Sequence, residues 1–445
     1  MEIFEVKEVA EGTINTSAAK YDYRYSDAPL FASAFKYSHE LGRQSLALAI
    51  ASKNIKERED FFEGSKNLEE FFSNCGYKDF CPNEDYKIMP RANSFGVGIA
   101  RKEVMIGSSK YTILAIGLRG GNYYAEWVGN FNVGTTGDHN GFEIATNKAF
   151  DHLKKYICDF EIKGDVILWV SGFSRAGAVT NLLGARIDKI LACGEQPFEG
   201  VTLSAGRAFF YTFEAPRGAM TNNVEITGFK NIFNIVNQND IIIYTAPKAM
   251  GFARYGTDIY LPVKDNTEKD EYNKIRDDIN KIFDNTSKEE IKRLNPRFMF
   301  DSLMMPSVKK MFDKGAVADF IEDFFDKFSA KLGNREDAQD IFIAIQRVLE
   351  LLVFPESGAS IPLGKLLRGK EVFYKALEES GIDEKTIDEA KKYIAEIGTF
   401  FADFSKDYRD ELDILTLNLF SMISTHDSAL EFAYMMALPE EYFRV

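Results

Sequence analysis

The sequence is poor in histidine, cysteine and positive charge, and each shortage argues against certain classes of function. Its 445 residues include four histidines and four cysteines, and the formal net charge is -14. Nucleic-acid affinity comes largely from Lys and Arg residues that release counterions from phosphates, so this charge balance argues against a nucleic-acid partner. An acidic surface favours solubility and is compatible with uncharged esters or lipids.

Long hydrophobic runs are also missing. No run approaches the roughly 18 apolar residues of a membrane-spanning helix. The first stretch, MEIFEVKEVAEG, has acidic residues where a signal peptide has a basic segment followed by an apolar block. We therefore expect a cytoplasmic protein with no transmembrane segment, for which a transient contact with a membrane or lipid surface stays open.

Neither the cysteines nor the histidines form a persuasive metal site. No CxxC spacing and no histidine pairing occurs among the cysteines, so we expect buried free thiols at Cys75, Cys81, Cys158 and Cys193. Asp138, His139 and Glu143 could be drawn as metal ligands, but one histidine among loop residues is weak evidence. Helix capping by Asp138 or Asn140 is the preferred interpretation. We expect no metal and no cofactor.

Strand-like and helix-like patterns alternate through the middle of the chain. We expect an N-terminal helical segment at 28–53, with a second amphipathic piece at 67–77. Further helices are expected at 141–160 and 176–192, and strands at 95–104, 111–118, 165–170, 208–216 and within 229–243. Such alternation predicts an α/β fold with a mostly parallel sheet covered on both faces.

The chain is longer than a single core usually grows, which is about 250 to 300 residues. From about 266 its texture changes to charged, amphipathic helices that continue to about 412. We therefore expect a core of residues 1–265 plus 413–445 and an all-helical insertion at 266–412, which is a candidate cap or lid. The last segment reads as helix, loop, helix, with Asp427 or Ser428 capping the second helix.

A serine occupies a sharp turn in ILWVSGFSRAG, residues 167–177. An apolar strand runs there into a helix-like segment, and Ser174 sits in a pattern similar to the GxSxG nucleophile elbow. Gly172 and Ala176 are small, as a crowded turn requires, and Gly177 completes the pattern. The alternative is an ordinary strand-to-helix connection, which also uses small residues.

A nucleophilic serine needs a base and an acid that orients the base. His426 is the only histidine downstream of Ser174, and α/β-hydrolases use the chain order serine, acid, histidine. Asp240 follows an expected strand and is the preferred acid, Glu214 is the alternative and Asp258 ranks third. A loop histidine at 426 and a turn aspartate at 240 are the non-catalytic interpretations.

Several motifs in the same order resemble the class 3, fungal-type lipases, a family of α/β-hydrolases. The resemblance spans roughly 95–260 and the last thirty residues. It is carried by the motifs AIGLRGG, EWVGNF, HNGFEIA, GFSRAG, TFEAPRG and VNQNDIIIYTAP. Ala176 and Glu214 stand where the family has glycine. The missing secretion signal suggests an intracellular, bacterial-type member.

The resemblance implies a role for each candidate residue. Ser174 would be the nucleophile, Asp240 the acid and His426 the base, with the backbone N–H groups of Gly121 and Arg175 as oxyanion donors. We expect a serine hydrolase that cleaves carboxylic esters of lipids or other acyl compounds through an acyl-enzyme. A thioesterase or acyltransferase with the same triad, and a non-catalytic protein that binds acyl ligands or a partner, are the alternatives.

Overall fold

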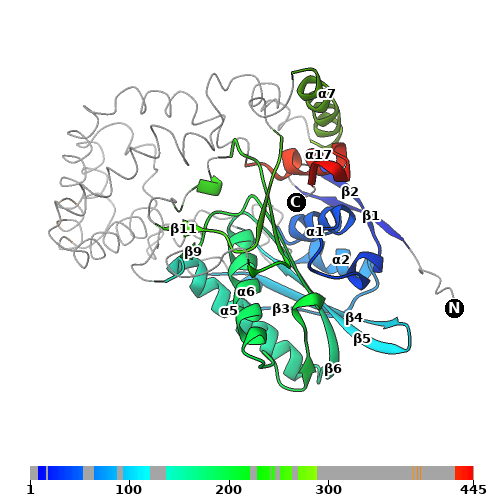
Figure 1. Cartoon of the computed structure of the whole chain (residues 1–445), viewed down its shortest axis with the longest axis vertical. Coiled ribbons are helices and arrows are strands. Elements are labelled where there is room, and N and C mark those ends of the chain that lie inside the picture. Colours follow the sequence, from blue (N-terminus) through cyan, green and yellow to red (C-terminus); the bar gives the residue numbers. More distant parts are fainter. Residues whose placement is uncertain are drawn as a thin grey trace.

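One central sheet organises the molecule. A computed structural model describes residues 9–16, 19–53, 65–87, 94–120, 137–220, 228–240, 242–244, 246, 251–262, 269–287 and 426–443, with the single residues 384, 388 and 391. The strands of the central sheet are β3 (Lys78–Pro82), β4 (Val97–Ile106), β5 (Ser109–Leu118), β6 (Gly164–Phe173), β7 (Val201–Thr202), β8 (Ala208–Phe213), β10 (Ile232–Val236) and β12 (Thr257–Tyr260). Their order is β12-β10-β8-β6-β5-β4-β3, and β7 pairs with β6. Figure 1 labels β3, β4, β5 and β6 of this sheet.

The sheet is mostly parallel. Strands β5, β6, β8, β10 and β12 pair in parallel, whereas β4 and β3 add to the β5 edge in antiparallel fashion. The expected α/β class is therefore confirmed, and the strand order together with the turn after β6 fits an α/β-hydrolase core. The short strand β3 was not expected, because KDFCP is brief and ends in proline.

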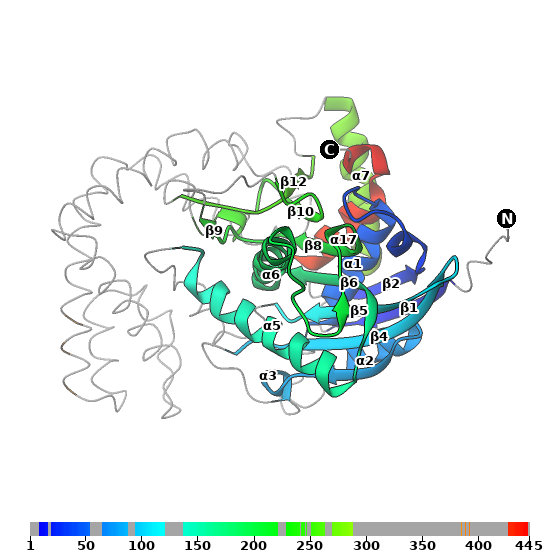
Figure 2. The same cartoon turned by 60° about the horizontal axis from the view of Figure 1, so that its bottom comes forward.

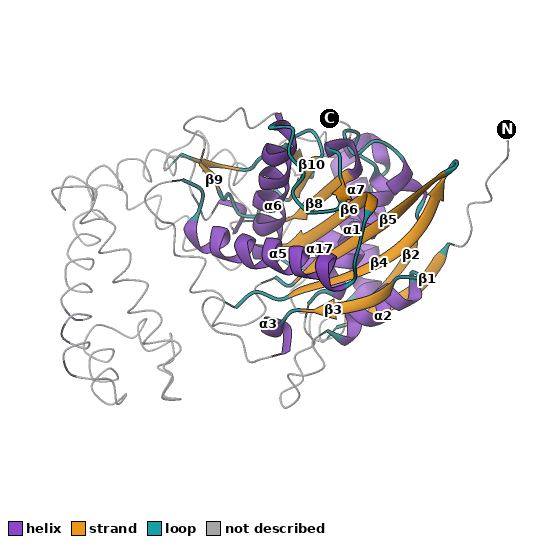
Figure 3. Cartoon of the chain, turned by 90° about the horizontal axis from the view of Figure 1, so that it is seen from below, coloured by secondary structure: helices purple, strands orange, loops and turns teal. Residues whose placement is uncertain are grey.

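Helices cover both faces of the sheet (Figure 2, Figure 3). The longer described helices are α1 (His39–Ala51), α2 (Lys66–Asn74), α5 (Asn140–Asp159), α6 (Arg175–Ala192), α7 (Lys269–Thr286) and α17 (Ser428–Ala437), and α3 (Glu84–Lys87) is a single turn. Ile167 and Trp169 of β6 pack with residues of α1 and α17, whereas Leu168 and Val170 pack with α5 and α6. Successive strand residues face opposite sides, so a strand covered on both faces is apolar throughout.

The N-terminal region differs from the expected helical segment. A hairpin of β1 (Ala10–Asn15) and β2 (Lys20–Tyr25) comes first, and the alternating burial of its tyrosines is typical of a half-buried strand. After the short 3-10 helix η1 (Ala28–Phe31), α1 begins only at His39, because Ser38 is extended and its side chain accepts the Leu41 N–H at 3.2 Å. The second expected helix is present as α2.

The two ends of the described chain lie side by side. Helix α17 packs against α7 and α1 (Figure 1), and Arg43 of α1 donates to the Met435 carbonyl at 2.8 Å. The Asp427 side chain accepts the Ala429 N–H at 2.6 Å, so the expected cap of the last helix is confirmed. Most of the expected insertion lies outside the described residues, and its boundaries stay a prediction.

The cysteines are free, but most of them are not buried. Cys75 is buried, Cys81 is half-buried, and Cys158 and Cys193 are exposed. The expectation of buried thiols was therefore wrong for the last two residues, because they lie at the C-terminal ends of α5 and α6, where each helix runs out into solvent. Among the described residues, no helix is both long and apolar enough to cross a bilayer.

Candidate active site

Ser174 forms a sharp corner between β6 and α6. Its backbone has φ 60° and ψ -128°, a conformation that residues other than glycine rarely adopt. The Ser174 N–H donates to the Phe213 carbonyl at 2.8 Å, so the end of β8 holds the corner in place. The corner projects the hydroxyl beyond the carboxyl end of the sheet, where ligands bind in open α/β folds.

The small residues around Ser174 follow from this geometry. A Cβ at Gly172 would lie 2.3 Å from the Ala176 carbonyl oxygen, and one at Gly177 would lie 2.9 Å from the Ala215 Cβ. The methyl group of Ala176 is fully buried in the core. The corner therefore demands glycine at 172, where the obstacle is backbone.

The three candidate triad side chains meet at one edge of the sheet. His426 Nε2 lies 2.7 Å from Ser174 Oγ, and His426 Nδ1 lies 2.5 Å from Asp240 Oδ2. The Asp240 side chain is fully buried, and that of His426 is 11% exposed. Asp240 also accepts the Ile242 N–H at 2.8 Å, so it shapes its own turn while it contacts the imidazole.

Burial sets the charge state of the imidazole. It lowers the pKa of His426, and the positive charge of Lys53 lowers that pKa further. A neutral imidazole with Nδ1–H directed at Asp240 leaves Nε2 free to accept a proton from Ser174. Burial raises the pKa of Asp240, and hydrogen bonds from the Glu214 side chain and the Ile242 N–H oppose that rise.

Lys53 belongs to the site, although nothing in the sequence singled it out. Its Nζ lies 3.9 Å from the centroid of the Phe173 ring, and that ring lies 5.2 Å from the His426 ring. Burial lowers the pKa of Lys53 to about 8. A lysine just after a helix is common, so only the fold reveals its place beside the triad.

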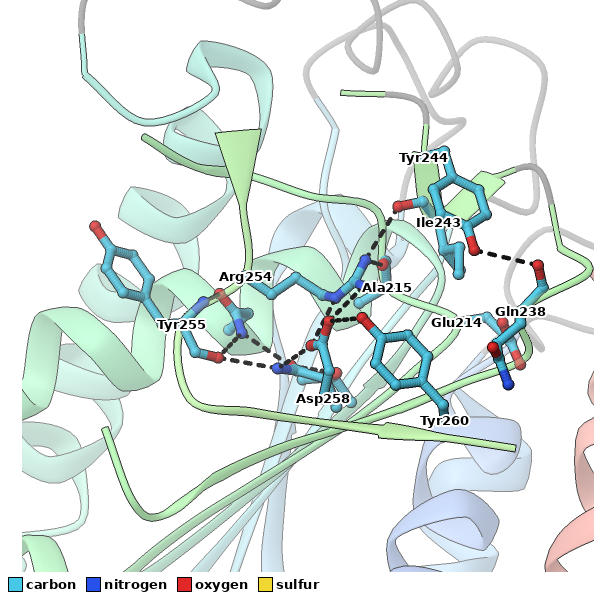
Figure 4. A network of polar contacts seen from close by, with 12 residues as sticks. Glu214, Ala215, Gln238, Ile243, Tyr244, Arg254, Tyr255, Asp258 and Tyr260 are labelled. Carbon is cyan, nitrogen blue, oxygen red and sulfur yellow. Dashed lines mark hydrogen bonds and ion pairs between the residues drawn. The ribbon is translucent and has the colours of Figure 1, made fainter. Parts of the chain in front are cut away.

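The loop that carries Asp240 is braced from several sides. Gln238 Nε2 donates to the Leu261 carbonyl at 2.8 Å. The Tyr244 hydroxyl donates to the Gln238 carbonyl at 3.1 Å, as Figure 4 shows. Asn237 Oδ1 accepts the Asn239 N–H at 3.1 Å. These bonds fix the short segment between β10 and Asp240, and so they fix the carboxylate that faces His426.

Arg254 links this loop to the neighbouring strand ends. Its buried guanidinium donates to the Ala215 and Ile243 carbonyls, both at 3.0 Å, and binds both oxygens of Asp258 at 2.9 and 2.7 Å (Figure 4). Asp258, the third-ranked acid, is therefore the partner of Arg254.

Glu214, the alternative acid, does not contact His426. Its carboxylate accepts the Asn237 N–H at 2.9 and 3.1 Å, while the contact with His426 is made by Asp240. Glu431 of α17 lies next to Glu214 and was missed. A single acidic residue inside the apolar helix SALEFAYMMA was the signal that could have found it.

Of the two expected oxyanion donors, one can be placed. Arg175 is the first residue of α6, where helix N–H groups point outward and the helix dipole is positive. Its side chain is buried, with Nη1 donating to the Ser94 carbonyl at 3.1 Å. Gly121 lies outside the described residues.

Asp138 and Glu143, two of the three weak metal-ligand candidates, have other partners. Asp138 accepts the Met220 N–H at 2.8 Å, and Glu143 pairs with Arg186. His139 occupies the N-cap of α5 and no side chain caps it, so the capping role expected of Asp138 or Asn140 was wrong. Among the residues that the structure describes, no group of three or more His, Cys, Asp or Glu could hold a metal ion.

The sequence matches no protein-family model and no curated protein. Several solved structures are similar at low identity. The lipase of Rhizomucor miehei in its propeptide complex is 16% identical, covering 51% of this chain and 70% of its own, with a TM-score of 0.35. Lipase II of Rhizopus niveus is 13% identical over 58% and 91%, with a TM-score of 0.32. The mono- and diacylglycerol lipase of Aspergillus oryzae is 16% identical over 52% and 82%, also with a TM-score of 0.32.

Proposed function

We propose that the protein is a serine hydrolase that cleaves carboxylic esters through an acyl-enzyme. The observation that carries the proposal is the continuous contact from Ser174 Oγ to His426 Nε2 and from His426 Nδ1 to Asp240, at 2.7 and 2.5 Å. A nucleophile, a base and an orienting acid in this arrangement are the parts that acyl transfer requires.

The reaction follows from the roles of these groups. Ser174 Oγ attacks the ester carbonyl as His426 Nε2 takes its proton, and Asp240 stabilises the imidazolium that forms. The N-terminus of α6, with the Arg175 N–H, faces the developing oxyanion, and the Gly121 N–H is the proposed second donor. The alcohol leaves with the proton from His426, after which water, deprotonated by the same imidazole, releases the acid and regenerates Ser174.

The ordered motifs shared with the class 3 lipases support acyl chains of lipids as the substrate class. The helical block from 266 to 412 is proposed as a cap over an apolar acyl site. Because Ile279 and Phe283 of α7 pack in the main core, the test replaces only residues 288–412 with a short linker. If the folded variant keeps the wild-type chain-length preference for p-nitrophenyl esters, the cap proposal is wrong.

A fluorophosphonate probe tests the enzyme proposal directly. We expect it to label the wild type and the Ser204→Ala control, whose serine is exposed, and to leave Ser174→Ala unlabelled. Failure to label a well-folded wild type would overturn the proposal in favour of a non-catalytic binding protein. Turnover of acyl thioesters over oxygen esters, or transfer to an added alcohol over hydrolysis, would replace ester hydrolysis with a thioesterase or acyltransferase activity.

A further inference from the structure

Two more carboxyl groups lie behind Asp240. Glu214, just after β8, and Glu431, on α17, are at most 1% exposed, as is Asp240. The Glu214 side chain lies next to that of Asp240 on one side and next to that of Glu431 on the other. Three acids therefore form a row that leads away from His426 into the core.

These three carboxyls cannot all be ionised. Adjacent like charges repel strongly where water is excluded, and a buried carboxylate without donors is costly. Among the described residues, neither oxygen of Glu431 has a hydrogen-bond donor as partner. The contact between Glu431 and Glu214 therefore needs one proton. The same reasoning applies to the contact between Glu214 and Asp240, which needs one proton of its own.

The backbone at Glu214 adds an independent observation. Its φ is 48°, in the left-handed region where glycine is favoured. Strain of this kind persists where the surroundings over-determine it, and it clusters at functional sites. The Asn237 N–H holds the carboxyl group in place, so the conformation places this acid against the loop that carries Asp240.

Other groups that could titrate or carry charge also face the row of acids. Asp240 is faced by His426 and Arg254. Tyr37 interacts electrostatically with Glu431, and Tyr434 with Glu431 and Glu214, while their hydroxyls bond His39 Nδ1 and the Pro262 carbonyl. Arg254 is already paired with Asp258. The pKa values of Glu214 and Glu431 are raised mainly by burial, and also by the neighbouring carboxyls.

We propose that Glu214 is a positioning residue that acts as a neutral acid. Protonated Glu431 donates a hydrogen bond to Glu214, and protonated Glu214 donates a hydrogen bond to Asp240. The row then holds a single negative charge, on Asp240, where it faces His426. One Glu214 oxygen carries the proton and the other accepts from Glu431, while the Asn237 N–H is shared between both oxygens. The proposal rests on the proposed function, since Asp240 matters there as the partner of His426.

Glu214→Gln and Glu214→Gly separate this role from simple packing. The amide of Gln can donate to Asp240 and accept from Glu431, but it cannot lose a proton. We expect Glu214→Gln to keep near wild-type kcat at neutral pH and to lack the alkaline decline that deprotonation of Glu214 causes in the wild type. Glycine suits the backbone but removes the donor, so Glu214→Gly should lower kcat about 10-fold to 100-fold with little change in KM.

The pH dependence of unfolding tests the same protons without catalysis. A folded pKa raised above the ordinary value of about 4.3 means that the folded state holds a proton that the unfolded chain releases. That contribution to stability is full below about pH 4.3 and is lost as pH rises through the folded pKa. The melting temperature of the wild type should therefore fall with rising pH more steeply than that of Glu214→Gln, and Glu431→Gln should flatten the curve in the same way.

Asp188→Asn is the matched control. Asp188 is a part-buried acid of α6, bonded to Asn231 at 3.1 Å, and burial raises its pKa to about 6. Its substitution should alter the stability curve and leave the pH profile of activity unchanged.

Glu214→Gln and Glu431→Gln with the wild-type stability slope would overturn the proposal. So would a Glu214→Gln that retains the wild-type alkaline decline of kcat. If the slopes flatten while the wild type neither labels nor hydrolyses esters, the neutral acids are supported and the proposed function fails.

Discussion

His426 Nε2 lies 2.7 Å from Ser174 Oγ, although the two residues are 252 positions apart. The contact depends on both ends of the chain, because Tyr21 of β2 bonds Ser428 at 3.1 Å and Arg43 of α1 bonds the Met435 carbonyl. The elements that lie before the sheet in the sequence therefore hold the helix that follows the imidazole.

The pH profile of ester hydrolysis should reflect the buried imidazole. His426 must be neutral to accept a proton, and burial lowers its pKa, so the acid limb of kcat/KM should lie below about pH 6.5, the ordinary histidine value. Lys53→Met removes a positive charge that lowers this pKa, so the limb should move to higher pH. Exposed Lys36→Met is the control, and a wild-type limb at or above pH 6.5 would contradict the assignment.

Asp240→Asn should preserve the fold and remove most of the activity. The amide presents a donor to His426 Nδ1 and favours the wrong tautomer, which in a serine triad costs about 10,000-fold in kcat. Steady-state kinetics on a p-nitrophenyl ester measure the loss. Asp165→Asn, an exposed aspartate at the start of β6, should behave as wild type, and comparable activity in both variants would count against Asp240 as the acid.

Gly172→Ala should destabilise the corner that carries Ser174. The added Cβ would meet the Ala176 carbonyl oxygen at 2.3 Å, and overpacking of this kind costs about 1–3 kcal/mol. The free energy of unfolding in urea and the rate of fluorophosphonate labelling should both fall. At Gly228 a Cβ meets nothing within 4 Å, so Gly228→Ala should change neither, and an unaffected Gly172→Ala would show that the corner can relax.

Arg254→Met should destabilise the loop that presents Asp240. It removes the Arg254 donor from two carbonyl groups and from Asp258, which keeps only the neutral donors Asn234 Nδ2 and the Tyr260 hydroxyl. Breaking a buried ion pair costs about 3–5 kcal/mol. Because Arg254→Met/Asp258→Leu removes both charges, it should recover part of that loss in urea unfolding. Equal stability of Arg254→Met and wild type would mean that the bonds are not maintained in solution.

Much of the architecture was predictable from local pattern. Apolar runs bounded by glycine marked β5 and β6, and apolar residues at helical spacing marked α5 and α6. In these elements the apolar residues of the sequence are the ones that the fold buries. The N-terminal hairpin was not predicted, although its alternating tyrosines are a strand signal. The first α-helix begins at His39 and not at the predicted residue 28. The expected caps of α5 failed because Asp138 takes the Met220 N–H instead.

By itself, the sequence determined a mostly parallel α/β core, a serine at a strand-to-helix corner and a single histidine downstream of it, since glycine spacing, apolar period and composition are local properties of the chain. Only the tertiary structure decided that Asp240 and not Glu214 faces His426, that Asp258 belongs to Arg254, and that Lys53 and Glu431 surround the site. Contacts between residues far apart in the chain depend on how strands align and helices dock, and a side chain's charge depends on the burial that results.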